Sequence, residues 1–172
     1  MDDPADWERH ITLRDGRAVF VRPIRPDDEA LYGTFLAAVT SEDARMRFLA
    51  PVGQLSHSLI EYFTHLDYAR AMAFVALDEN SGELLAVVRL HNNAANDSAE
   101  YAIVVRSDYK GHGLGWQLMQ MMVAYGRARG LRSIEGKVLQ ENKAMLDMCR
   151  QLGFAISMDP GNPSICDVRL AL

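Results

Sequence analysis

The fold of this chain is decided by residues 100–115, EYAIVVRSDYKGHGLG. The alternation in their first part predicts a strand over 99–105, and apolar side chains at helical spacing follow Gly115. A loop with three alternating glycines therefore joins a strand to a helix. The first amides of a helix have no internal partner, and glycine lets a ligand approach the backbone closely. The loop thus predicts an anion site suited to a pyrophosphate, with a tight turn that binds nothing as the alternative.

Two widespread phosphate-binding loops do not fit this segment. A Walker loop needs Gly-Lys followed by Ser or Thr, and the chain has no such tripeptide. A dinucleotide fingerprint needs a third glycine three residues after the second, but Trp116 stands there. That fingerprint also follows the first strand of a βαβ unit, whereas this loop comes late in the chain.

The rest of the chain predicts a mixed α/β sheet in a single domain, residues 1–172. A hairpin at about 10–22 is expected around Asp15-Gly16, a strong turn signal. Three short helices and three strands follow, then helix, strand, helix and two closing strands. The expected strands cover 72–77, 84–90, 99–105, 134–138, 154–156 and 165–170, and the expected helices begin near Asp27, Ser41, Ser58, Gly115 and Asn142.

Composition excludes several classes of protein. The 172 residues are 49% hydrophobic and 24% charged, as in a globular domain, and their net charge of −5 argues against a general nucleic-acid binder. Cys149 and Cys166 form no metal-binding motif, so neither a disulfide framework nor a metal site is expected. The longest apolar run, 71–77, is too short to span a membrane, and the acidic N-terminus is unlike a secretory signal. We therefore expect a cytoplasmic protein without a membrane partner.

Two segments resemble motifs of the GNAT acetyltransferase superfamily. Residues 110–115, KGHGLG, resemble its coenzyme A loop, usually written Gln/Arg-x-x-Gly-x-Gly/Ala. Residues 142–154, NKAMLDMCRQLGF, resemble its second motif, an Asn followed by a helix that ends in Gly-Phe. Further stretches resemble the catalytic domain of bacterial Pat-type protein lysine acetyltransferases: Trp7-Glu-Arg, Leu13-Arg-Asp-Gly16, 22–29, 66–68 and 99–105.

The resemblance implies a GNAT fold with a central, mostly antiparallel mixed sheet flanked by helices, and an acetyl-CoA core at about 72–172. It implies acetyl-CoA as cosubstrate, no metal, and a protein lysine such as that of an acyl-CoA synthetase as acceptor. The chain leaves no room for the regulatory domains of several relatives, so their regulation is not expected here. The residues implied in coenzyme binding are Ile103, Val104, Val105, Lys110, Gly111, His112, Gly113, Leu114, Gly115, Trp116 and Asn142.

This sequence departs from the family pattern at two positions. Lys110 replaces the usual Gln or Arg at the start of the loop, which keeps a charge but loses the forked contact of an arginine. Cys149 stands where many members have a Tyr that protonates the departing thiolate. We interpret Cys149 as a small buried core residue, because it lies on an apolar helical stripe.

Glu100 is the expected general base. A lysine amine has a pKa of about 10.4 and is mostly protonated at neutral pH, so a nearby carboxylate has a proton to remove. The alternative is an exposed strand glutamate without a role. His91 is a second candidate base on the neighbouring strand, and Asp67 and Tyr68 line the acceptor cleft in the resemblance or else form a structural turn.

Three functions remain open at this stage. The first is an N-acetyltransferase acting on a protein lysine, with direct attack of the amine on acetyl-CoA. The second is a GNAT enzyme for a small-molecule amine, which would share every motif above. The third is a non-catalytic acyl-CoA sensor, which the absent Tyr motivates. The physiological acceptor, the acyl-chain preference and the oligomeric state do not follow from the sequence.

Overall fold

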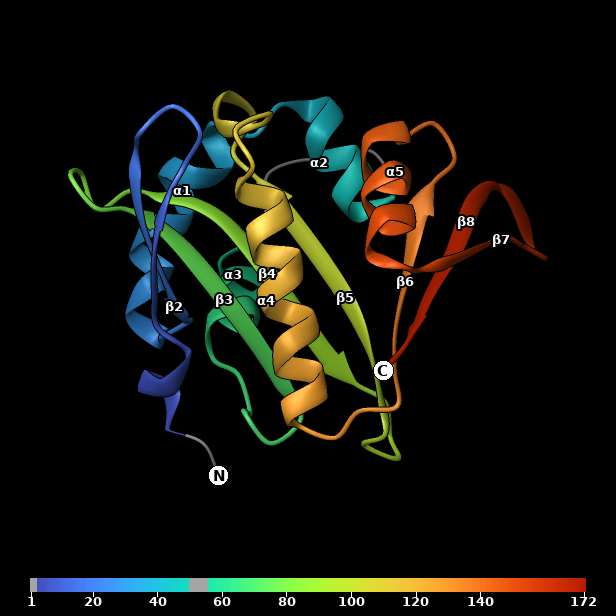
Figure 1. Cartoon of the computed structure of the whole chain (residues 1–172). Coiled ribbons are helices and arrows are strands. Elements are labelled where there is room, and N and C mark those ends of the chain that lie inside the picture. Colours follow the sequence, from blue (N-terminus) through green and yellow to red (C-terminus); the bar gives the residue numbers. More distant parts are fainter. Residues whose placement is uncertain (1–2, 50–55) are drawn as a thin grey trace.

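The computed structural model describes residues 3–49 and 56–172. Within these residues, eight strands form one sheet in the order β1-β2-β3-β4-β5-β6-β8-β7 (Figure 1). All neighbouring strands are antiparallel except β5 and β6, which are parallel. The strands are β1 Arg9–Thr12, β2 Ala18–Pro23, β3 Ala71–Asp78, β4 Leu84–Asn92, β5 Ser98–Val105, β6 Ser133–Leu139, β7 Ala155–Asp159 and β8 Asn162–Ala171.

Helices cover both faces of this sheet. In Figure 1, α4 lies across β3, β4 and β5 on one face, with α5 beside it, while α1 and α3 lie on the opposite face. The helices are α1 Glu29–Ala37, α2 Ser41–Phe48, α3 His57–Thr64, α4 Leu114–Ala128 and α5 Lys143–Leu152, and short 3₁₀ turns occur at Pro4–Trp7, Pro26–Asp28 and Ser107–Tyr109. The mixed α/β fold class predicted from the sequence is confirmed.

Two cores form because consecutive apolar side chains of the central strands point alternately to the two faces of the sheet. On β3, Phe74 packs into the larger core beneath α4 and α5, while Ala73 and Val75 pack into the smaller core beneath α1 and α3. A strand buried on both faces reads as a continuous apolar run. This explains why 71–77 is the longest apolar run. Among the described residues, no helix combines the length and apolarity that a membrane span requires.

Glycines set the ends of the predicted elements. Gly16, at φ +88°, lies in the loop that closes the β1–β2 hairpin, and Gly113, at φ +90°, immediately precedes α4. Gly153, at φ +94°, ends α5, where the amide of Phe154 bonds the carbonyl of Cys149. The final strand begins at Asn162 rather than at the predicted Ile165, because its pairing with β7 continues to the turn at Asp159.

The parallel pair β5 and β6 separates soon after it begins. Its registered pairs are Ser98 with Ser133, Ala99 with Ile134, and Glu100 with Glu135. At the next step the ring of Tyr101 lies against β6, so close that a Cβ on Gly136 would come 2.4 Å from Tyr101 Cε1. Only glycine allows this approach. The strands therefore diverge from Tyr101 onward, and a cleft opens between them.

Candidate active site

The cleft between β5 and β6 has a volume of about 700 Å³. It is bordered by β5, by the glycine loop, by α5 and by α2. Most of the predicted site residues line it: Glu100, Ile103, Val104, Val105, Lys110, Gly111, Gly113, Gly115, Trp116 and Asn142. The tertiary structure thus brings two sequence motifs and one strand to a single cavity.

The remaining two predicted residues point elsewhere. Leu114 is 1% exposed and packs in the larger core, so only its backbone faces the loop. His112 Nδ1 lies 3.7 Å from a carboxylate oxygen of Asp15, and the carbonyl of His112 accepts from the amide of Arg14 at 3.5 Å. These contacts join the glycine loop to the β1–β2 hairpin loop.

The start of α4 presents backbone amides to the cleft. Gly113 occupies the N-cap position and has no side chain to cap the helix, whereas Thr40, Ser56 and Asn142 cap α2, α3 and α5 with their side chains. The uncapped amides and the helix dipole favour an anion at this end. The start of α4 is therefore a site suited to an anion, and binding of a pyrophosphate there stays a prediction.

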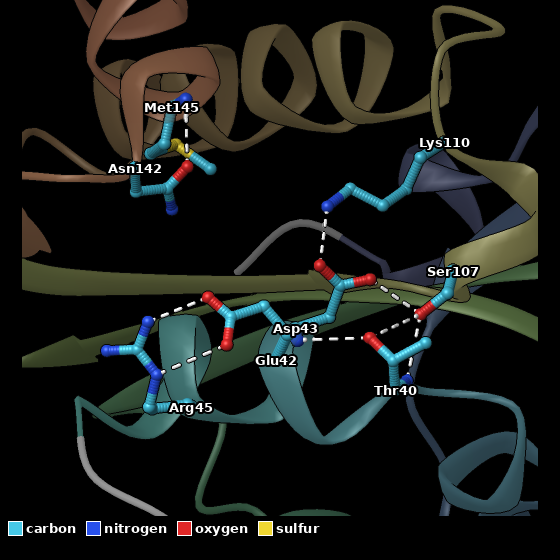
Figure 2. Close-up of polar contacts among 8 residues, drawn as sticks. All are labelled: Thr40, Glu42, Asp43, Arg45, Ser107, Lys110, Asn142 and Met145. Carbon is cyan, nitrogen blue, oxygen red and sulfur yellow. Dashed lines mark hydrogen bonds and ion pairs between the residues drawn. The ribbon is translucent and has the colours of Figure 1, made fainter.

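Lys110 is half-exposed and forms an ion pair with Asp43 on α2. Its Nζ lies 2.7 Å from Asp43 Oδ1, and Ser107 Oγ donates to Asp43 Oδ2 at 2.5 Å; Figure 2 draws both contacts. The amide of Asp43 in turn donates to Thr40 Oγ1 at 3.2 Å. Burial raises the pKa of Asp43, but the hydrogen bonds from Lys110 and Ser107 outweigh it, so that the pKa falls below its ordinary value.

Helix α2 is also tied to the opposite side of the cleft. Arg45 forms ion pairs with Glu42 on its own helix and with Glu141, which lies immediately before the N-cap residue of α5. Together with the contact between Asp43 and Lys110, this pair holds α2 between the glycine loop and α5. The sequence analysis did not anticipate this role of α2, because its partners lie about 67 to 96 positions away.

Glu100 is exposed and belongs to the last registered pair before β5 and β6 separate. Its registered partner on the neighbouring strand β4 is His91. Both side chains therefore face the side of the sheet that carries α1 and α3. Burial lowers the pKa of His91, and the charges of Arg89 and Arg47 lower it further. His91 is therefore neutral at neutral pH, and its ring stacks on Tyr62 with the centroids 6.1 Å apart.

Cys149 is fully buried on α5, as predicted for a core residue. Its Sγ lies 3.3 Å from the hydroxyl oxygen of Tyr101, and burial raises the pKa of the Cys149 thiol. Burial likewise raises the pKa of Tyr101 well above its ordinary value. Both groups are thus protonated at neutral pH, which leaves no thiolate nucleophile at this position.

Among the cleft residues that the sequence did not predict are Arg14, Arg47 and Phe48. Arg14 belongs to the hairpin loop, and its Nε lies 3.5 Å from the position that a Cβ on Gly113 would occupy. Its charge adds to the anion site, yet about a hundred residues separate it from the glycine loop. Arg47 and Phe48 come from α2, whose sequence carries no motif.

Asp67 and Tyr68 form a structural turn. The carboxylate of Asp67 accepts from the amide of Ala69 at 3.0 Å, and the hydroxyl of Tyr68 donates to the carbonyl of Ile24. Neither residue lines the cleft between β5 and β6. Of the two interpretations left open for them, the contacts favour the structural one.

Comparisons with known proteins agree with this geometry. Residues 37–154 match the family described as Acetyltransferase (GNAT) family. The chain is 32% identical over 163 residues, 94% of this chain and 88% of the relative, to acetyltransferase PA5475 of Pseudomonas aeruginosa. It is 28% identical to acetyltransferase Pat of Mycolicibacterium smegmatis over 144 residues, which are 83% of this chain and 43% of that protein.

A solved structure extends the likeness to the whole fold. The GNAT domain of S. lividans PAT superposes with a TM-score of 0.90 at 30% identity, over 99% of this chain and 100% of that chain. Its resemblance therefore supports a Pat-type catalytic domain. Since the family matches most of the chain and a relative of 32% identity covers 94% of it, this chain belongs to the GNAT acetyltransferase family and is an acetyl-CoA-dependent N-acetyltransferase.

Proposed function

We propose that this enzyme transfers the acetyl group of acetyl-CoA to the side-chain amine of a protein lysine, with Glu100 as general base. The observation that carries the proposal is the position of Glu100, at the point where β5 and β6 separate and at the edge of the cleft with the glycine loop. The likeness to Pat-type domains supports a lysine of an acyl-CoA synthetase as the acceptor.

The proposed coenzyme site uses backbone groups for most of its contacts. The amides at 111–116 would hold the pyrophosphate, and the edge of β5 at 103–105, beyond its last pair with β6, would hold the pantetheine arm. Asn142 is the N-cap of α5 and also lines the cleft. Its side-chain amide can therefore cap the helix and form a hydrogen bond to the coenzyme. Lys110 would change partner or share its charge between Asp43 and a phosphate.

In the proposed reaction, the acceptor amine loses a proton to the carboxylate of Glu100 and attacks the thioester carbonyl. Amides of β5 polarise that carbonyl as the oxyanion forms. The tetrahedral intermediate expels the coenzyme A thiolate, which takes up the second proton that the attacking nitrogen must lose, and the acetyl group remains on nitrogen as an amide. Glu100 then releases its proton to solvent. No enzyme nucleophile takes part, because proximity and orientation suffice for direct attack.

A cytoplasmic location is part of the proposal. Cys149 and Cys166 are both free thiols, which is typical of proteins in a reducing compartment.

The test is mass spectrometry of acyl-CoA synthetases incubated with the enzyme and acetyl-CoA. We expect acetylated lysines with the wild type and a strongly reduced yield with Glu100→Gln. Acetylation of small amines but of no protein would support the small-molecule alternative instead. Binding of acetyl-CoA without turnover on any amine would identify the protein as a sensor and overturn the proposal.

A further inference from the structure

A second cavity, of about 360 Å³, lies on the side of β4 and β5 that carries α1, α2 and α3. We call it the arginine pocket, because Arg47 and Arg89 project from its otherwise mainly apolar wall. It shares Arg47, Phe48 and Val104 with the cleft between β5 and β6, so the two cavities are neighbours. Its volume suits a ligand of side-chain size.

Arg89 is 4% exposed on β4. Its Nη2 donates to the hydroxyl oxygen of Tyr32 at 2.9 Å, its Nη1 donates to the carbonyl of Phe63 at 3.3 Å, and its guanidinium lies 4.5 Å from the centre of the Phe63 ring. These partners are neutral. A guanidinium has five N–H donors, so they neither neutralise the charge nor use all its hydrogen bonds.

Arg47 is half-buried on α2 and contacts rings. Its guanidinium lies 4.6 Å from the centre of the Phe48 ring and 6.0 Å from that of Phe63. Burial lowers the pKa of Arg47 to about 10, with the charge of Arg89 as the next cause. Within residues 3–49 and 56–172, no carboxylate lies within ion-pair distance of Arg47 or Arg89.

The other buried arginine of the described residues, Arg22, has a carboxylate partner within the fold. Arg22 is 7% exposed, and Asp28 accepts from both of its terminal nitrogens, at 2.7 and 2.8 Å. A buried charge is costly unless it is paired, and this pair meets that requirement within the fold. Two neighbouring guanidinium groups without such a partner are complementary to an anion supplied from outside.

The base and the two cations lie close together. Arg89 pairs with Ala102 across β4 and β5, and His91 pairs with Glu100, so Arg89 and Glu100 are diagonal neighbours on one face of the sheet. Such neighbours have backbones about 7–8 Å apart. One compact acceptor could therefore place its amine at Glu100 and a second group in the arginine pocket.

We propose that the arginine pocket binds a carboxylate of the acceptor, and that this enzyme prefers amines carrying a carboxylate near the reacting nitrogen. Two forked donors match the two oxygens of a planar carboxylate. The hydroxyl of Tyr32 accepts from Arg89 and so keeps its own hydrogen for a third contact. Two cations would also repel a lone ammonium, which argues against an acceptor without an anionic group.

This inference rests on acetyl transfer at Glu100 and specifies the acceptor. The carboxylate has two possible sources: an acidic residue next to the target lysine, or the α-carboxylate of a free amino acid. The first probe is a pair of lysine peptides that differ only by Glu or Gln beside the lysine. The second is a set of free amino acids with their carboxamides. We expect kcat/KM at least about tenfold higher for the carboxylate member of one set.

Two substitutions locate the effect. Arg89→Met should abolish the preference between the matched acceptors while the KM for acetyl-CoA stays constant, and Arg89→Lys should restore part of it. Arg47→Met should abolish the same preference; its KM for acetyl-CoA is not used as a readout, because Arg47 also lines the cleft between β5 and β6. Arg127→Met, at an exposed position of α4, is the control. Arg47 is half-buried, so its variant keeps the test available if Arg89→Met does not fold.

Equal kcat/KM for every matched pair would overturn the inference and leave the proposed acetyl transfer intact. So would a preference that persists in both arginine variants. Calorimetric titration of the same probes in the presence of coenzyme A measures the preference without turnover. A protein that acetylates no amine but binds the carboxylate member better, through these arginines, would support the pocket and contradict the proposed reaction.

Discussion

Strand β5 borders two cavities that are built differently: the cleft along its edge and the arginine pocket on its face. Along the edge that turns away from β6, the proposed coenzyme contacts come mainly from backbone groups of one continuous segment, 100–116, in a cleft that α2 and α5 also line. On the face toward α1, α2 and α3, the arginine pocket is made of side chains from separate elements, with Tyr32, Arg47 and Arg89 from α1, α2 and β4. A backbone site tolerates changes in side chains, whereas a side-chain site changes its ligand with each substitution. One fold can therefore keep its coenzyme while its acceptor varies.

The largest effect is expected at Glu100, which lies between the two sites. Glu100→Gln keeps the shape of the side chain and removes the base, so kcat at neutral pH should fall by about 10² to 10⁴. The affinity for acetyl-CoA should stay nearly constant. The defect should shrink at high pH, where more of the amine is already deprotonated.

Steady-state kinetics across pH and calorimetry with acetyl-CoA check this prediction. Glu135→Gln is the matched control, since Glu135 is the registered partner of Glu100 on β6 and is similarly exposed. A rate within twofold of the wild type at every pH would assign the base to another group, and His91 would be tested next.

Gly113→Asp should weaken the binding of acetyl-CoA and leave the arginine pocket unchanged. Gly113 has φ +90° at the start of α4, and an aspartate there adds strain and a negative charge beside the expected phosphates. Acetyl-CoA affinity should fall by about a hundredfold or more, the scale of a lost charge-assisted contact together with repulsion.

Gly130→Asp provides the control for backbone strain, because Gly130 has φ +74° with open space around its Cα and lies past the other end of α4. Titration calorimetry on both folded variants separates the two causes. Unchanged affinity in Gly113→Asp would show that the loop does not hold the phosphates.

Cys149→Ala tests whether Cys149 has a structural role in the core or a catalytic role in acetyl transfer. Removing the buried sulfur leaves a small cavity and the hydroxyl of Tyr101 without this partner, so stability should fall by about 1 kcal/mol. Turnover per folded molecule should hardly change. Cys166→Ala, at the other buried cysteine, should behave alike.

Thermal unfolding and single-turnover assays measure the two quantities. A collapse of turnover with an unchanged melting temperature would contradict the structural role. So would a kinetically competent acetyl group trapped on Cys149 in a quenched reaction.

The smallest effect is expected at Asp43, which joins α2 to the glycine loop. Its pKa is lower in the folded protein than its ordinary value of 3.8, so the stability it contributes is present above that value and is lost as the pH falls through the folded value. Because Lys110 is half-exposed, Asp43→Asn should cost less than about 1 kcal/mol at neutral pH.

The difference in melting temperature between Asp43→Asn and the wild type should shrink as the pH is lowered below about 4. Asp27→Asn, which removes a carboxylate at an exposed position, is the control. A difference that grows toward low pH would mean that the carboxylate of Asp43 destabilises the folded state.

The elements of the fold were predictable because their signals are local. Apolar runs predicted β3 and β4, and glycines marked the start of α4 and the end of α5. The glycine loop and β5 could be placed at one cavity for the same reason, since they are one segment. Even here the outcome at Lys110 was not predictable, because its partner Asp43 lies 67 positions earlier.

Sequence alone therefore determined the strand-loop-helix segment, the family it resembles and the candidate base at Glu100. Only the tertiary structure decided that β5 and β6 separate at Tyr101, that α2 borders the cleft, and that Arg47 and Arg89 share a pocket. The physical reason is the distance along the chain over which each kind of signal acts. Periodicity and turn chemistry act over a few residues, whereas a charged pocket depends on which distant side chains the packed sheet and helices bring together.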